Sequence, residues 1–429
     1  MTEISLTRDL FGKLEIPGER LVGVYGPNHS IRPGLGDEDL RERIRNPVGA
    51  SPLREMARGA RNVLVVTDDI TRQTPLHRVL PPLIEELAEA GVPREGIRFL
   101  IGLGTHRAMT DEEITRKFGE DIPPKYPVTN HIWDDPKELA SLGVCDLGFE
   151  VLVNRLVTET DFLIAVGSII PHATAGFSGG GKSIMPGVCG EATIEATHWA
   201  ALDYGMGEIL ANFDNRVREA AVSVCRQVGL RFIVNTIMCE EGKVFDLVAG
   251  DVEEAHRLGT ERCLDVYGVA VEDAADVVVA EAFPTDIDLR QAIKAVCSAD
   301  IVCRDGGVII LPADCPEGVS PQFPDFSRYG FRDPEGLFRA VEAGEFTQKL
   351  LAYTLVAIGR IISKRVKGIL VSAHVGEAEA ERMGFLWAPS LQEAADRAME
   401  MTGPGSRVMV LKEAGEIIPR IRAVGAGAR

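Results

Sequence analysis

Several common signals are missing from this chain of 429 residues. It has no run of about 18 apolar residues, the length that a membrane-spanning helix needs. Its first residues, MTEISLTRD, lack the apolar core of a signal peptide. Internal repeats and low-complexity segments are absent too. From these absences we expect a cytoplasmic protein that does not bind a membrane.

Paired cysteines and positive charge are also scarce. None of the eight cysteines forms a C-x-x-C pair, which argues against a zinc or iron–sulfur knuckle. Lys and Arg number 46 against 64 Asp and Glu, giving a net charge of −18. This charge disfavours nucleic acid as a partner, although an acidic surface can still enclose a basic pocket.

Short Val, Ile and Leu runs alternate with helical patterns along the chain, which is typical of α/β folds with mostly parallel strands. A charged helical pattern over 252–265, followed by a new apolar run, indicates a domain boundary. We therefore expect two α/β domains, residues 1–270 and 271–429, with an active-site cleft between them. A helix is expected over Arg78–Ala90, and the expected strands are Asn62–Val66, Ile97–Leu103, Phe162–Ile169, Phe232–Met238, Asp276–Ala280, Val308–Leu311, Gly368–Ser372 and Val408–Leu411.

The most informative segment is the loop PHATAGFSGGGKSIMPG, residues 171–187. Glycines let backbone N–H groups approach a phosphate, and Lys182 adds an amine or a positive charge. Gly176–Ser183 fits the nucleotide-binding pattern G-x-x-x-x-G-K-[ST], so a P-loop ATPase or kinase is one interpretation. A P-loop, however, leaves its strand directly and opens a helix at the Lys-Ser pair. Here residues 171–175 intervene and Pro186-Gly187 follow, which disfavours that interpretation.

Other polar clusters follow the expected strands, where open α/β sheets bind ligands. DDITRQTP follows the first strand and GTHR the second, while the third runs into the glycine loop. Gln291 and Lys294 are three residues apart and so share a helix face. Three of the eight histidines, His106, His172 and His198, lie in or near these segments. The other five are expected to be structural or surface residues: His29, His77, His131, His256 and His374.

Together, the DDxTRxTP, GTHR and PHxxAGFSGGGKxxxPG strings resemble the nickel-dependent lactate racemase family, the nickel-pincer-nucleotide 2-hydroxyacid racemases and epimerases. The resemblance covers nearly the full length. It implies that Lys182 is joined through a thioamide to pyridinium-3-thioamide-5-thiocarboxylic acid mononucleotide. It also implies nickel held by two sulfurs and a ring carbon of this cofactor and by His198, a ligand set suited to square-planar Ni(II). The residues that would hold the nucleotide are Asp69, Thr71, Ser178, Gly179, Gly180 and Gly181.

A racemase treats mirror-image substrates alike, so it needs a proton acceptor on each side of the reacting carbon. The resemblance assigns these roles to His106 and His172, because imidazole exchanges protons near neutral pH. One histidine removes the hydroxyl proton while hydride leaves the α-carbon for the cofactor, and hydride then returns to the other face of the 2-oxo acid. Arg72 and Lys294 would hold the substrate, with Gln291 assisting. Separate proteins that make the cofactor are implied as partners.

The chain departs from lactate-type members at two positions. Arg290 stands where they carry an aromatic residue before the glutamine of Q-x-x-K, and Phe346 aligns with a tryptophan. An extra guanidinium could pair with a second carboxylate, so we hypothesise a larger or dianionic 2-hydroxy acid such as malate. The alternative is an Asp286–Arg290 ion pair on an exposed helix face. A non-catalytic carrier of the nickel nucleotide is another open interpretation.

Overall fold

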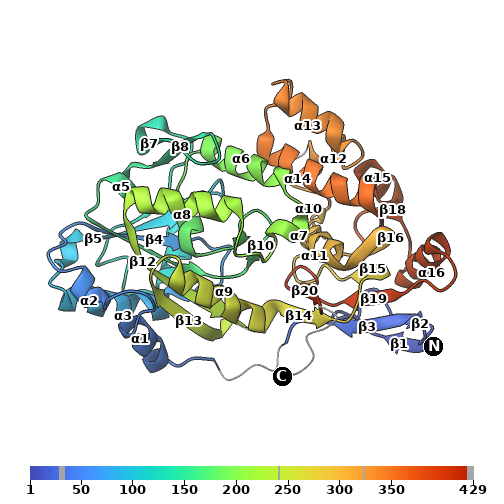
Figure 1. Ribbon diagram of the computed structural model, residues 1–429, viewed down its shortest axis with the longest axis horizontal. Helices are drawn as coiled ribbons and strands as arrows, with labels where there is room; N and C mark the ends of the chain where they lie inside the picture. Colours follow the sequence, from blue (N-terminus) through green and yellow to red (C-terminus); the bar gives the residue numbers. More distant parts are fainter. Residues whose placement is uncertain (29–33, 240–241, 322, 324, 423–429) are drawn as a thin grey trace. The chain divides into compact units, whose positions relative to one another are not determined.

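The computed structural model describes residues 1–28, 34–239, 242–321, 323 and 325–422 (Figure 1). The chain forms two compact units, each with its own sheet. The N-terminal unit comprises residues 29–203 and 208–266, and the C-terminal unit comprises residues 1–28, 204–207 and 267–429. No helix in the described ranges is long and apolar enough to cross a membrane.

The N-terminal unit is built on a six-stranded sheet of order β13-β12-β9-β4-β5-β6. Five strands are parallel, and β13 runs antiparallel to β12. The central strands are continuous apolar runs because helices cover both faces of such sheets. The strands are β4 (Val63–Asp68), β5 (Ile97–Gly102), β6 (Val128–Asn130), β9 (Phe162–Ser168), β12 (Leu230–Met238) and β13 (Val244–Gly250).

Helices α1, α3 and α4 share one apolar core with alternate residues of β4 and β5. Thr110 caps the N-terminus of helix α4, and its hydroxyl accepts the N–H of Glu113 in a capping box. Two hairpins, β7–β8 (Leu139–Val144, Glu150–Asn154) and β10–β11 (Pro171–His172, Gly176–Phe177), extend from the sheet connections. The helices are α1 (Asp37–Arg45), α2 (Leu53–Met56), α3 (Leu76–Glu89), α4 (Asp111–Phe118), α5 (Arg155–Thr158), α6 (Glu191–Ala200), α8 (Arg216–Val228) and α9 (Glu254–Tyr267), with α7 (Met206–Ile209) at the division between the units.

The C-terminal unit has a six-stranded, fully parallel sheet of order β18-β17-β16-β15-β19-β3. Helix α16 and the β1–β2 hairpin pack on it in one apolar core. The strands are β1 (Thr2–Ile4), β2 (Leu14–Ile16), β3 (Leu21–Tyr25), β14 (Gly268–Val271), β15 (Ala275–Ala280), β16 (Cys303–Pro312), β17 (Lys367–Val371), β18 (Leu386–Trp387), β19 (Val408–Leu411) and β20 (Ile418–Ile421). The helices are α10 (Leu289–Ala292), α11 (Lys294–Val302), α12 (Phe326–Tyr329), α13 (Pro334–Glu342), α14 (Lys349–Gly359), α15 (Glu377–Met383) and α16 (Leu391–Thr402).

All eight expected strands are present, as β4, β5, β9, β12, β15, β16, β17 and β19, and the expected helix is α3. The expected domain of residues 1–270 differs from the observed division at its start. Residues 1–28 belong to the C-terminal unit because β3 pairs with β19 and completes the edge of its sheet. In Figure 1 the blue strands β1–β3 accordingly lie beside the red β19.

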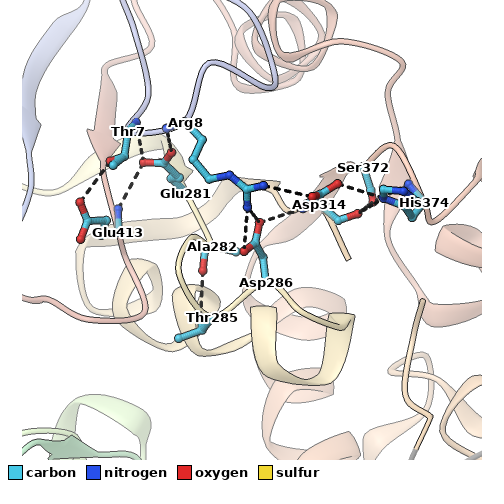
Figure 2. A network of polar contacts seen from close by, with 10 residues as sticks. All are labelled: Thr7, Arg8, Glu281, Ala282, Thr285, Asp286, Asp314, Ser372, His374 and Glu413. Atoms are coloured by element: carbon cyan, nitrogen blue, oxygen red, sulfur yellow. Dashed lines mark hydrogen bonds and ion pairs between the residues drawn. The ribbon is translucent and has the colours of Figure 1, made fainter. Parts of the chain in front are cut away.

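A polar network binds this N-terminal segment to the carboxyl ends of the C-terminal strands (Figure 2). The buried carboxylate of Glu281, after β15, accepts the backbone N–H groups of Thr7 at 3.0 Å and Arg8 at 3.1 Å. The Arg8 guanidinium pairs with Asp286 at 3.4 Å and Asp314 at 3.2 Å. The segment therefore neutralises two carboxylates that the rest of the unit places side by side.

Replacing Arg8 with Ala should destabilise the chain by about 1–3 kcal/mol, because the poorly exposed Asp286 and Asp314 side chains lose their shared cation. Urea unfolding of the full-length protein measures this. The matched control is Lys13→Ala, which breaks an ion pair with Glu3 whose two side chains are 59% and 56% exposed. That change should cost less than about 1 kcal/mol. Equal effects would contradict the role given to Arg8.

Candidate functional site

Three loops at the carboxyl edge of the N-terminal sheet form the candidate site. They follow β4, β5 and β9, and β4 lies between the other two, so the loops are neighbours. The N–H of Gly104 in the second loop donates to Gly187 O in the third at 2.9 Å. Asp68 joins the first and third, since its carboxylate accepts the Ser168 N–H at 3.1 Å. The edge of the sheet thus brings together three segments that are far apart in the sequence.

Asp69 and His106 form a close polar pair in the site. Asp69 Oδ2 lies 2.6 Å from His106 Nδ1, and its Oδ1 accepts the Thr71 N–H at 3.0 Å and hydroxyl at 2.5 Å. Burial alone would raise the pKa of Asp69, but the hydrogen bonds from His106 and Thr71 and the charge of Arg72 hold it at about 2. The ionised carboxylate assigns the proton of a neutral His106 to Nδ1, which leaves Nε2 as the basic nitrogen.

The pKa of Lys182 is affected by two of the same charged side chains, Asp69 and Arg72. Lys182 lies in a single 3-10 turn, η3 (Gly180–Ser183); the residue as a whole is partly exposed, whereas its terminal amine is buried. Its pKa falls to about 8, chiefly because burial disfavours the charged amine, and secondarily because of the Arg72 guanidinium; Asp69 acts in the opposite direction. At pH 7 a pKa of 8 leaves about one amine in ten neutral, against about one in three thousand for an ordinary lysine. The site therefore favours a nucleophilic lysine.

The glycines of the loop are required by close packing against protein. Gly176, Gly179 and Gly180 have φ values of +79°, +74° and +49°, which other residues rarely adopt. A Cβ on Gly176 would lie 2.1 Å from Asn212 O, and one on Gly180 would lie 2.6 Å from the His256 ring. The sequence suggested phosphate approach as their reason, and packing supplies a second one.

The loop also carries internal hydrogen bonds. The Ser178 hydroxyl donates to Ser168 O at 2.7 Å and accepts the Ile170 N–H at 2.9 Å. The Gly180 N–H donates to Asn235 Oδ1 at 2.9 Å. The predicted contacts of Ser178, Gly179, Gly180 and Gly181 with a nucleotide stay predictions, because these bonds already use the Ser178 hydroxyl and one loop N–H group.

The loop does not have the geometry of a P-loop. The β10–β11 hairpin separates β9 from the glycines, and the chain makes only the single turn η3 at Lys182 and Ser183. The next α-helix, α6, begins at Glu191. A P-loop needs the N-terminus of a helix at its Lys-Ser pair to hold phosphate. The local fold therefore argues against the ATPase or kinase interpretation.

His172 and His198 hold defined ring orientations. On β10, His172 Nδ1 accepts the Thr174 N–H at 3.2 Å, which assigns the proton of a neutral ring to Nε2. On α6, His198 Nδ1 lies 2.8 Å from Ile194 O, so Nδ1 donates and the lone pair of Nε2 is the one suited to a metal. Across the described ranges, no group of three or more His, Cys, Asp and Glu side chains could hold a metal ion.

The remaining predicted residues lie in the C-terminal unit. Arg290 and Gln291 are on α10, and Lys294 begins α11. The Arg290 guanidinium carbon lies 4.6 Å from the centre of the Phe323 ring, and burial lowers the pKa of this arginine. The alternative of an exposed Asp286–Arg290 pair was wrong. Asp286 precedes the helix, is buried, and pairs with Arg8.

The domains of one known family match most of the chain. Residues 10–207 match the lactate racemase N-terminal domain, and residues 270–418 match the lactate racemase C-terminal domain. A lactate racemase of Lactiplantibacillus plantarum is 30% identical over 380 residues, 88% of this chain and 89% of that protein. The chain belongs to the lactate racemase family. As a member of this family it is an isomerase.

Other relatives extend the comparison. A lactate racemase of Thermoanaerobacterium thermosaccharolyticum is 31% identical over 310 residues, 71% of this chain and 72% of that protein. The structure of the lactate racemase apoprotein from this organism superposes with a TM-score of 0.86 at 26% identity, covering 98% of this chain and 100% of that one. A Thermotoga maritima protein, at 21% identity and a TM-score of 0.68 over 91% of this chain and 100% of that one, shares the fold.

Sequence reasoning missed the residues of this family member that support the site. His256 and Asn235 contact the backbone of the glycine loop, and His131 donates from Nε2 to Cys189 O at 2.8 Å just before α6. His131 and His256 are buried, as expected for structural histidines, while His29 lies outside the described residues. No local sequence pattern predicts the hydrogen-bond partner of a buried histidine.

Proposed function

We propose that this chain racemises or epimerises a 2-hydroxy acid with a nickel-pincer nucleotide attached to Lys182. The observation that carries the proposal is the placement of the Lys182 loop and the Asp69–His106 pair at one edge of the sheet. The lowered pKa of the Lys182 amine supports it. An amine kept partly neutral is suited to covalent attachment. The relatives named lactate racemase make a small 2-hydroxy acid the expected substrate.

Side chains of the N-terminal unit would hold such a cofactor. His198 would be the protein ligand to nickel through Nε2, because its Nδ1 is directed to Ile194 O. Any metal here needs further ligands from a bound group, since the described residues offer no three-ligand cluster. Asp69, Thr71 and the loop around Gly179 and Gly181 would hold the nucleotide. Once bound, the cofactor would supply a reversible hydride acceptor. The proposal also implies that separate proteins make the cofactor and that this chain works in the cytoplasm.

We assign opposite proton transfers to His106 and His172. His106, fixed by Asp69, presents a basic Nε2, whereas His172, fixed by the Thr174 N–H, carries its proton on Nε2. His106 would accept the substrate hydroxyl proton at Nε2, while His172, once protonated to the imidazolium, would return a proton to the oxygen. The two rings would exchange these roles and charge states when the mirror-image substrate reacts. Arg72, placed near both Asp69 and Lys182, would hold the substrate carboxylate.

We further propose that Arg290 selects a larger or dianionic 2-hydroxy acid, with malate as the test case. Its guanidinium is partly buried against Phe323, and a planar guanidinium can bind a carboxylate through two parallel N–H donors. Gln291, beside it on α10, and Lys294, the first residue of α11, would contact the same substrate.

Replacing Arg290 with Ala should raise KM for malate by roughly 10- to 100-fold and KM for lactate by less than about threefold, because only the dianion loses an ion pair. Steady-state kinetics on cofactor-loaded protein measure both. Arg328→Ala is the matched control, since Arg328 also lies over an aromatic ring, that of Tyr329. It should leave both values unchanged. Equal increases for malate and lactate in Arg290→Ala would defeat the specificity proposal.

A further inference from the structure

His256, on α9, contacts the backbone of the glycine loop. It is 1% exposed, and its Nε2 lies 2.9 Å from Ser178 O. The ring also packs against Phe213, with centroids 5.6 Å apart. Burial lowers the pKa of His256 to about 4, because the interior disfavours the protonated ring. The positive charge of the nearby Arg218 acts in the same direction. The neutral ring therefore donates one hydrogen bond, from Nε2 to the loop carbonyl.

A second side chain fixes the same stretch of backbone. Asn235, on β12, is fully buried and accepts the Gly180 N–H at 2.9 Å. The Ser178 carbonyl and the Gly180 N–H thus have separate side-chain partners on either side of Gly179. A Cβ added to Gly180 would also lie only 2.6 Å from the His256 ring. The ring and the loop are therefore fitted to each other immediately before Lys182.

We propose that His256 is a positioning residue, which holds the Ser178–Gly180 backbone so that the Lys182 amine stays shielded from water beside Asp69 and Arg72. The inference rests on the proposed role of Lys182 as the attachment point. It assigns to His256 no contact with substrate or cofactor. Its consequence is that the reactivity of Lys182 depends on a hydrogen bond to a carbonyl four residues earlier.

The test measures the acetylation of Lys182 by acetic anhydride as a function of pH, with the full-length, cofactor-free chain and peptide mass spectrometry. The wild-type midpoint should lie near 8. His256→Leu removes the donor and lets water reach the amine, so the midpoint should rise by about one pH unit or more, toward the ordinary 10.5. His256→Gln keeps an N–H at similar reach and should restore the midpoint to within about 0.3 units.

A matched control separates positioning from general destabilisation. His131 is equally buried and also donates from Nε2 to a backbone carbonyl, that of Cys189. His131→Leu should lower stability and leave the Lys182 midpoint near 8. An unchanged midpoint in His256→Leu, a failure of His256→Gln to restore it, or an equal shift in His131→Leu would each overturn the proposal.

A second variant keeps the proposal falsifiable if His256→Leu does not fold. Gly180→Ala places a Cβ against the intact ring and should displace the loop, raising the midpoint in the same direction. An unchanged midpoint there would count against the proposal. The acetylation readout needs no cofactor, so its failure is distinct from failure of the proposed function. If the shifts are as expected but loaded protein carries nothing on Lys182, the positioning role stands and the attachment is wrong.

Discussion

Replacing His106 with Gln should lower kcat by about 10²- to 10⁴-fold, with KM much less affected. The variant loses the basic Nε2 that Asp69 orients, while the loop carrying Lys182 is untouched. Turnover per loaded chain, measured from each enantiomer, reports the loss. Because the two histidines exchange roles, both directions should be impaired.

The control for this experiment is His77→Gln, which changes an exposed histidine on α3 in the same unit. Its kcat should match that of the wild type. Cofactor content must be measured in parallel, since a variant that fails to load would be inactive for another reason. A loaded His106→Gln protein with near-normal kcat would remove His106 from the reaction. It would favour the carrier interpretation if His172→Gln behaved in the same way.

Replacing Lys182 with Arg should abolish both cofactor attachment and activity. Arginine keeps the positive charge but is protonated at every accessible pH, so it offers no neutral amine. After gel filtration of protein made with the cofactor-producing proteins, nickel per chain should fall to background in Lys182→Arg. The control Lys125→Arg changes an exposed lysine that pairs with Asp121, and it should retain nickel. Retained nickel and activity in Lys182→Arg would exclude covalent attachment as a requirement.

The parts of the fold that the sequence predicted are those with strong one-dimensional patterns. Buried parallel strands such as β4 and β9 are continuous apolar runs, and the pattern locates them to within a few residues. Strand β3, LVGVY, is short and only partly buried, so it does not stand out. Its pairing with β19 joins residues almost 400 positions apart, which no local pattern encodes. This is why the start of the first domain was misplaced.

The candidate site was also predictable only where the sequence carries a local pattern. Asp69, His106 and Lys182 could be grouped because each follows a strand, and carboxyl ends of neighbouring parallel strands share one edge. His256 and Asn235 could not be assigned to this group, because the loop residues that they contact are 78 and 55 positions away in the sequence. The ion pair of Asp286 could not be predicted either, because its partner Arg8 is 278 residues away in the sequence. Tertiary packing, rather than spacing, decides such contacts.

The central claim is that the Lys182 amine carries the nickel nucleotide. Peptide mass mapping of active protein, purified from a host that makes the cofactor, tests it most directly. The account predicts that the peptide containing Lys182 carries the mass of the nucleotide, in proportion to nickel content and activity. Active protein with an unmodified Lys182 would contradict it.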